Sequence, residues 1–190
     1  MSNKILLLTI VVLAIGAAIF FVFRDSGTYS NEHVSISLPA EWRVVEGPTP
    51  EIVSFISPDI AGSSSDDEEC DVSSDCIDIL TSGYRVGINV LPKGSWIPAD
   101  NSEVTLDYLI ASREEAKEKD PEIQYSVETV GNYEGILEMY INKENTVRYI
   151  SFDTVKNGVV YKFGIAAPTN SNIESMQAIF REILGSLRLK

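Results

Sequence analysis

The sequence predicts an α+β protein in which an N-terminal transmembrane helix is followed by one domain with a mainly antiparallel sheet and two main helices. Three observations predict this fold class. Residues 5–23 form an apolar run without a charge. Several later segments alternate apolar and polar residues between turn residues, which is typical of antiparallel strands. Residues 106–119 and 173–187 place apolar residues at helical spacing.

The N-terminal run is long enough to cross a membrane. A helix of this length spans ~28 Å, close to the ~30 Å hydrocarbon core of a bilayer. Cleaved secretory signals have a shorter apolar stretch of ~7–15 residues followed by small residues, whereas the small residues here lie inside the run. We therefore expect residues 1–24 to be an uncleaved anchor in the cell membrane. A cleaved signal peptide and a buried soluble helix are the alternatives.

The charge of the chain constrains its partners and its orientation. The net charge is −13, and residues 25–190 carry −15 because Lys4 and Arg24 are the charges of the first 24 residues. Such an acidic surface disfavours nucleic acid and anionic lipid as partners. Solubility alone explains it, and cationic partners or divalent ions are compatible with it. The basic residues around the run slightly favour a C-terminal domain outside the cytoplasm.

The domain is expected to begin after a short polar linker at residues 25–32 and to occupy residues 33–190. Alternation or β-rich composition predicts strands at 34–38, 42–45 and 52–57. Pro39 and the Gly47–Pro50 segment separate them as turns.

Residues 59–78 are expected to be an acidic insertion, and residues 58–74 are expected to form a long loop. Ten acids and no basic residue lie between Arg43 and Arg85. Calcium binds six to eight oxygens on flexible carboxylate-rich segments, so the loop at 66–78 is a candidate for weak divalent-cation binding. A solvated loop without a ligand is the alternative, because the spacing matches no calcium-loop motif. The candidate ligands are Asp66, Asp67, Glu68, Glu69, Asp71 and Asp75. No other cofactor is expected.

Cys70 and Cys76 are the two cysteines of the chain. Their spacing is not the C-x-x-C of a zinc or redox motif, and the single histidine cannot complete a zinc site. We expect them to form a disulfide, since the domain is predicted to lie outside the cytoplasm.

A strand, a helix and a four-strand meander follow the insertion. Tyr84 to Leu91 alternates strongly, and a helix capped by Ser102 or Thr105 is expected to run to Lys119. The meander strands are predicted at 123–130, 136–141, 147–155 and 159–166, with a turn at 131–135 between the first two. Asn157-Gly158 between the last two is typical of a type I′ hairpin turn, so the meander is expected to be antiparallel.

The C-terminal helix has the clearest apolar stripe. Ser171 to Glu174 fits a capping box, and Gly185 is the expected end of the helix. Residues 187–189 are expected to return to a sheet edge. The stripe consists of Ile173, Met176, Ile179, Phe180, Ile183, Leu184 and Leu187.

Two segments carry a resemblance to a known family. The opening, Val34 to Trp42, joins a strand, a proline and a tryptophan, and the ending runs from the strand at Val159 through the last helix to Leu187. In this order of elements, residues 33–190 resemble the PsbP-like family, which includes the photosystem oxygen-evolving subunit P and many anchored bacterial proteins. The resemblance implies an α/β/α sandwich and a non-catalytic assembly or binding role, and it transfers no site residue.

The sequence contains no motif for catalysis. Nucleophile elbows, metalloprotease helices, phosphate loops and dinucleotide fingerprints are absent. A serine triad would need His33, which stands at the start of a strand. The expected function is therefore a membrane-anchored, non-enzymatic binding or assembly module that meets another protein at the membrane surface. A calcium-responsive module is the main alternative and a hydrolase the least favoured. Trp42, Trp96 and Tyr108 are candidates for a ligand groove, with core packing as the alternative.

Overall fold

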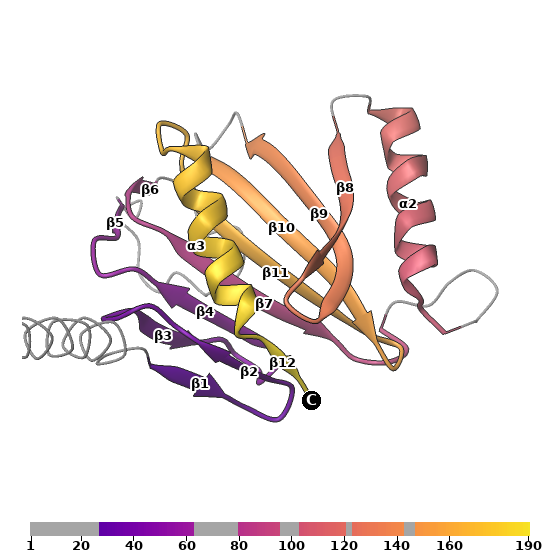
Figure 1. Ribbon diagram of the computed structural model, residues 1–190, viewed down its shortest axis with the longest axis horizontal. Coiled ribbons are helices and arrows are strands. Elements are labelled where there is room, and N and C mark those ends of the chain that lie inside the picture. Colours follow the sequence, from indigo (N-terminus) through magenta and orange to yellow (C-terminus); the bar gives the residue numbers. More distant parts are fainter. Residues whose placement is uncertain (1–26, 63–79, 96–102, 121–122, 143–146) are drawn as a thin grey trace, which may run out of the picture.

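The computed structural model describes residues 27–62, 80–95, 103–120, 123–142 and 147–190. Its largest element is a seven-stranded sheet in which every neighbouring pair is antiparallel (Figure 1). The strand order is β3 (Arg43–Glu46), β4 (Ile52–Ile56), β7 (Arg85–Leu91), β11 (Val159–Pro168), β10 (Val147–Lys156), β9 (Tyr133–Asn142) and β8 (Gln124–Val130).

Two small sheets accompany the large one. The three-stranded sheet has the order β1 (Thr28–Ser30), β2 (Val34–Ser37) and β12 (Arg188–Leu189). The other joins β5 (Ala61–Gly62) to β6 (Leu80–Ser82). The chain end thus returns to a sheet edge as expected, and that edge belongs to β2.

One face of the large sheet carries the main hydrophobic core. Helix α3 (Ile173–Gly185) and the three-stranded sheet cover it (Figure 1). The main hydrophobic cluster lies between these layers and includes the following fully buried side chains: Phe55, Ile88, Ile150, Phe152, Phe163, Met176, Phe180 and Leu184. The predicted stripe of α3 therefore faces the core, and the face containing Val86, Ile88 and Val90 does so too.

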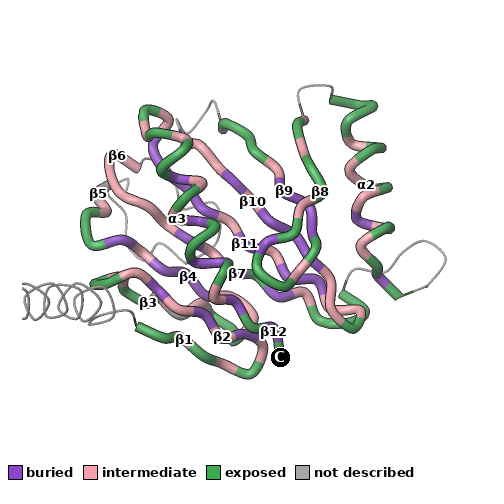
Figure 2. Tube along the Cα trace, in the orientation of Figure 1, coloured by how far each residue is buried: buried purple, intermediate pink, exposed green. Residues whose placement is uncertain are grey.

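Helix α2 (Leu106–Lys119) packs against the opposite face of the same sheet. A second cluster joins Leu109 of α2 to Ile136 and Val160, whose chain neighbours Leu137 and Tyr161 belong to the main cluster. Because successive strand residues point to opposite faces, the two clusters lie on the two sides of the sheet. The helix is largely exposed in Figure 2. Helices on both faces give the α/β/α layering that the resemblance implied.

Local signals placed several elements correctly. Thr105 caps α2, with its hydroxyl accepting from the Tyr108 N–H at 3.2 Å. Asn157 and Gly158 both have positive φ, as a type I′ turn requires, and join β10 to β11.

Four expectations about local structure were wrong. The segment predicted as a linker contains β1, whose Thr28–Ser30 pairs with β2. The segment predicted as a loop after Pro58 contains β5. The cap of α3 is Asn172, whose side chain accepts from the Ser175 N–H at 2.9 Å.

The fourth concerns β9, which begins at Tyr133 and not at Ile136 because Gly135 is a strand residue. A Cβ on Gly135 would lie 2.5 Å from the carbonyl oxygen of Asp153 and 2.6 Å from the ring of Phe152. This glycine therefore marks close packing and not a turn.

The predicted membrane anchor, residues 1–24, lies outside the described residues. Within the part of the chain that the structure describes, neither helix has the length and apolar character to cross a bilayer.

Candidate functional site

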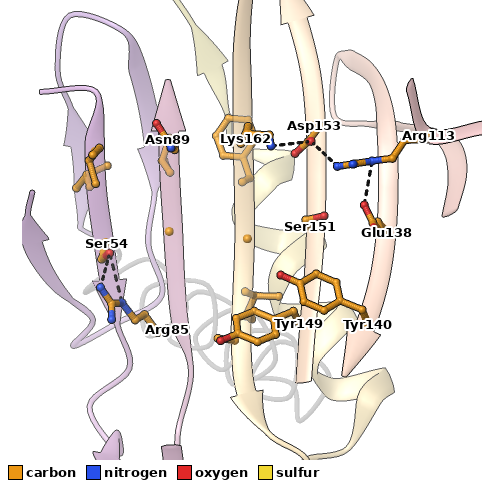
Figure 3. Close-up of a pocket in the computed structure, with 18 of the residues that line it drawn as sticks. Ser54, Arg85, Asn89, Arg113, Glu138, Tyr140, Tyr149, Ser151, Asp153 and Lys162 are labelled. Carbon is orange, nitrogen blue, oxygen red and sulfur yellow. Dashed lines mark hydrogen bonds and ion pairs between the residues drawn. The ribbon is translucent and has the colours of Figure 1, made fainter. Parts of the chain in front are cut away.

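The α2 side of the large sheet carries an elongated hollow that α2 leaves uncovered (Figure 3). The strand register places four small residues side by side across four strands, where larger side chains would stand out from the sheet. Ser54 of β4 pairs with Gly87 of β7, Gly87 pairs with Gly164 of β11, and Gly164 pairs with Ser151 of β10. We call the hollow over these four residues the trough.

Packing does not explain why the trough has glycine at positions 87 and 164. A Cβ on Gly87 would meet no atom within 4 Å, and one on Gly164 would meet only the carbonyl oxygen of Ile150 at 3.9 Å. Neither residue has a positive φ. Glycine weakens a strand, and where packing does not require it, it often marks close approach of a ligand or another backbone.

An ion-pair row borders the trough on one side. It consists of Asn89, Lys162 and Asp153, which are neighbours on β7, β11 and β10. The Asp153 Oδ2 lies 3.3 Å from Nη2 of Arg113 on α2 and 3.6 Å from Nζ of Lys162. The same guanidinium binds Glu138 through Nε at 3.0 Å. Arg113 thus fixes α2 to the sheet at one end of the trough.

Asp153 is the most buried charge of this group, since its side chain is only 6% exposed. Loss of solvent raises the pKa of its carboxyl above the ordinary value, and the charges of Lys162 and Arg113 offset that effect only in part. Two cations contact this buried carboxylate, and Arg113 also binds Glu138, so the cluster is a structural ion-pair network at the wall of the trough.

A tyrosine row borders the other side. It consists of Arg85, Ala166, Tyr149 and Tyr140, which are neighbours on β7, β11, β10 and β9. The two tyrosine rings are stacked, with centroids 4.9 Å apart and planes 13° apart. Tyr140 is 48% exposed, so the aromatic pair forms a partly accessible wall.

Arg85 turns from its row toward the trough. Its Nε and Nη2 both donate to the hydroxyl oxygen of Ser54, at 3.4 and 3.3 Å (Figure 3). These two donors form the edge of a guanidinium that binds a carboxylate or phosphate in bidentate fashion. Both hydrogen bonds to Ser54 are longer than the usual 2.7–3.2 Å of an N–H···O hydrogen bond, and Arg85 has a further interaction besides them.

The trough has the size and lining of a small-molecule site. Its volume is about 650 Å³, inside the ~300–1,000 Å³ range of ligand pockets. Pro48 and Ile52 add apolar surface beside β4, and the tyrosines add it beside β9. An apolar site with a few convergent polar groups is the usual composition of such pockets.

The charge of the lining differs from that of the chain. Arg85, Arg113 and Lys162 line the trough together with two acids, Glu138 and Asp153, whereas the whole chain has 15 basic and 28 acidic residues. Among the described lining residues, basic side chains therefore outnumber acidic ones, unlike in the chain as a whole.

The residues singled out in the sequence lie elsewhere. Trp42 packs against the main cluster and Tyr108 against the second one, so these two side chains do not meet. Trp96 lies outside the described residues, as do the cysteines and the acidic candidates at 66–75. The disulfide and the calcium loop stay predictions. Among the described residues, no group of three or more His, Cys, Asp or Glu could hold a metal ion.

Sequence reasoning missed the trough although one signal was present. Gly87 stands inside the segment predicted as a strand at 84–91, and Gly164 inside the one at 159–166. A lone glycine in a strand pattern suggests close backbone approach. The two positions become neighbours only through the pairing of β7 with β11, which local sequence patterns do not specify.

Comparison with known proteins gives structural similarity without sequence similarity. No protein-family model matches the sequence, and no curated protein does. A protein from Bacteroides thetaiotaomicron is 15% identical with a TM-score of 0.50 over 87% of this chain. The chain spans about half of that protein, 49% of its length. This similarity shows a shared fold.

The family expected from the sequence is among the similar solved structures. PsbP from Synechocystis is 12% identical, with a TM-score of 0.47, and the match covers 87% of this chain and 93% of PsbP. LpqN of Mycobacterium tuberculosis, described as involved in cell envelope biogenesis, is 10% identical, with a TM-score of 0.45 over 87% of this chain and 91% of LpqN. These two matches assign no residue of this chain a role.

Proposed function

We propose that this chain is a membrane-anchored, non-enzymatic binding module whose binding site is the trough. The observation that carries the proposal is the pair of directly opposed glycines, Gly87 and Gly164, which keep the sheet bare where packing leaves room for side chains. Bare backbone between a charged row and an aromatic row is suited to holding a ligand against the sheet.

A binding role fits the side chains better than a catalytic role. The most perturbed carboxyl of the site, Asp153, is compensated by two cations at 3.3 and 3.6 Å, as in a structural ion pair. The serines of the trough would need a general base to act as nucleophiles. The one histidine of the chain, His33, directly precedes β2 in the three-stranded sheet.

The binding site is tested by filling the trough. A leucine at position 164 would project into it, whereas an alanine would leave it open, because the space beside Gly164 is empty. Full-length wild type, Gly164→Ala and Gly164→Leu, each in lipid nanodiscs, are screened by ligand-observed NMR against a fragment library of mixed charge. We expect fragments that bind wild type and Gly164→Ala and are lost with Gly164→Leu. Equal binding to all three proteins would contradict the proposal, provided that thermal unfolding shows Gly164→Leu to be folded.

The anchor is tested separately. Mass spectrometry of the membrane-extracted protein should find the peptide containing residues 5–23 still attached. A mature N-terminus between residues 18 and 29 would show that the segment is a cleaved signal, and the tethered part of the proposal would then be wrong.

A further inference from the structure

A second hollow lies at the end of the large sheet, where β9 ends and α3 begins (Figure 1). Its volume is about 750 Å³, inside the ~300–1,000 Å³ range of ligand pockets. It is open because β9 runs on to Asn142, past Met139, which is the last of its residues that pairs with β8. We call this hollow the end groove.

Aliphatic side chains from three parts of the fold line the end groove. They are Ile123, Met139, Ile141 and Ile173. Met139 and Ile141 are 38% and 49% exposed, although they alternate with Leu137 of the main cluster and so stand on the α3 side of the sheet. Exposed apolar side chains gathered at a groove are typical of a binding site.

Arg148 is the cation of the end groove. It pairs with Ile141 across β10 and β9, so both side chains leave the sheet on the same side. Its Nη2 donates to the carbonyl oxygen of Thr169 at 3.2 Å. Its buried Nε has no acceptor among the described residues, and none of the described acids forms an ion pair with this arginine. The half-buried guanidinium thus has no counter-charge in the part of the chain that the structure describes.

This guanidinium has the donors that an oxyanion needs. Charges removed from water are usually paired, and a guanidinium carries several N–H donors besides the one that Thr169 accepts. Its hydrogen bonds to a carboxylate are about twice as strong as those to a neutral oxygen. A carboxylate in the end groove would therefore bind more tightly than a neutral amide of the same shape.

From this arrangement we propose that the end groove binds an aliphatic monocarboxylate, with its carboxylate on the guanidinium of Arg148 and its chain along Ile141 and Met139. Methionine adapts to irregular apolar partners, which suits a flexible chain. A head group with one negative charge fits a single arginine better than a phosphate dianion does, because Asp120 and Glu138 also line the groove. The inference concerns a second site and does not depend on the trough.

The test uses a reporter that the chain already contains. The chain has three methionines, of which Met139 lines the end groove and Met176 is 0% exposed in the core. Full-length protein with ¹³C-methyl methionine, in lipid nanodiscs, is titrated with hexanoate, hexanamide and acetate, and the NMR shift of the Met139 methyl gives each affinity. We expect hexanoate to bind about tenfold or more tightly than hexanamide, which lacks the charge, and than acetate, which lacks the chain.

Three variants carry the decision. Arg148→Gln should abolish the preference for hexanoate and leave the affinity for hexanamide within about twofold. Arg188→Gln makes the same charge change at an exposed residue of β12 and should preserve the preference. Ile141→Ser changes a half-exposed side chain and should weaken hexanoate and hexanamide alike.

Equal affinity of wild type for hexanoate and hexanamide would overturn the inference, and so would a Met139 methyl that none of the probes shifts. A preference that survives Arg148→Gln would overturn it as well. If thermal unfolding shows that Arg148→Gln does not fold, Ile141→Ser decides, and undiminished hexanoate binding by that variant would contradict the inference. None of these outcomes bears on the trough, which Gly164→Leu tests.

Discussion

The two faces of the seven-stranded sheet are built from alternating residues of the same strands. One face is covered by the main hydrophobic core, whereas the other is partly open. On the α3 side, Phe152 and Phe163 are 0% and 1% exposed and belong to one continuous hydrophobic cluster. Their chain neighbours Asp153 and Gly164 lie on the α2 side. Asp153 is part of an ion pair, and Gly164 has no side chain to cover the backbone. The first face therefore holds most of the buried apolar residues, and the second carries the trough.

The helices repeat this contrast. Helix α3 buries Met176, Phe180, Ile183 and Leu184, whereas α2 buries only Leu109. The contact of α2 with the sheet is completed by Arg113, whose guanidinium binds Glu138 and Asp153. Because α2 covers little of its face, the trough stays open.

The largest expected effect compares two neighbours on β11. Phe163→Ala removes a ring from the closed face and should lower the free energy of unfolding by about 3–5 kcal/mol. Lys162→Ala, one residue earlier on the open face and 33% exposed at its side chain, should cost less than half as much. Urea unfolding of both variants provides the comparison. A loss of similar size from both would mean that the open face contributes to stability as the core does.

The strands and their buried residues could be predicted because each depends on local pattern. Alternation identified Val86 and Ile88 as core, and helical spacing identified Phe180 and Leu184. The same alternation implied that Gly87 and Gly164 face away from the core. Their juxtaposition, however, depends on a pairing between two residues that are 164 − 87 = 77 positions apart in the sequence, and pairing of that kind is set by the packing of the whole domain.

A second prediction separates two kinds of strand glycine. Gly135→Ala should destabilise the protein by about 1–3 kcal/mol, because the new Cβ would lie 2.5 Å from the carbonyl oxygen of Asp153 and 2.6 Å from the ring of Phe152. Thermal unfolding followed by circular dichroism measures the change. A neutral Gly135→Ala variant would show that β9 and β10 can separate locally, and the packing argument for this glycine would be wrong.

A third prediction concerns the buried charge of the open face. Burial raises the pKa of Asp153 in the folded protein above its ordinary value of 3.8. The folded state therefore holds this proton at a higher pH than the unfolded state does. The resulting stability is fully present below the unfolded pKa and is lost as pH rises through the folded pKa.

Asp153→Asn should remove this contribution. Relative to the variant, wild type should gain stability as pH falls through the window between the raised pKa and 3.8. Urea unfolding at several acid pH values measures the difference between the two proteins. A difference that stays constant across the window would show that the carboxyl titrates at the same pH in both states, and one that changes in the opposite direction would show that Arg113 and Lys162 outweigh burial.

The smallest expected effect tests the meaning of the bare backbone itself. Gly87→Ala and Gly164→Ala introduce a Cβ with no neighbour closer than 3.9 Å, and neither position has a positive φ. Alanine restricts the unfolded chain more than glycine does, so each change should stabilise the protein by up to ~1 kcal/mol. This change in stability is opposite in sign to that expected for Gly135→Ala, on the same sheet and with the same substitution.

If the two trough variants were destabilised as strongly as Gly135→Ala, packing would account for these glycines and the main argument for a ligand over them would be lost. If they are more stable than wild type, the protein carries two glycines that its own folding does not require, and a bound ligand becomes their best physical explanation.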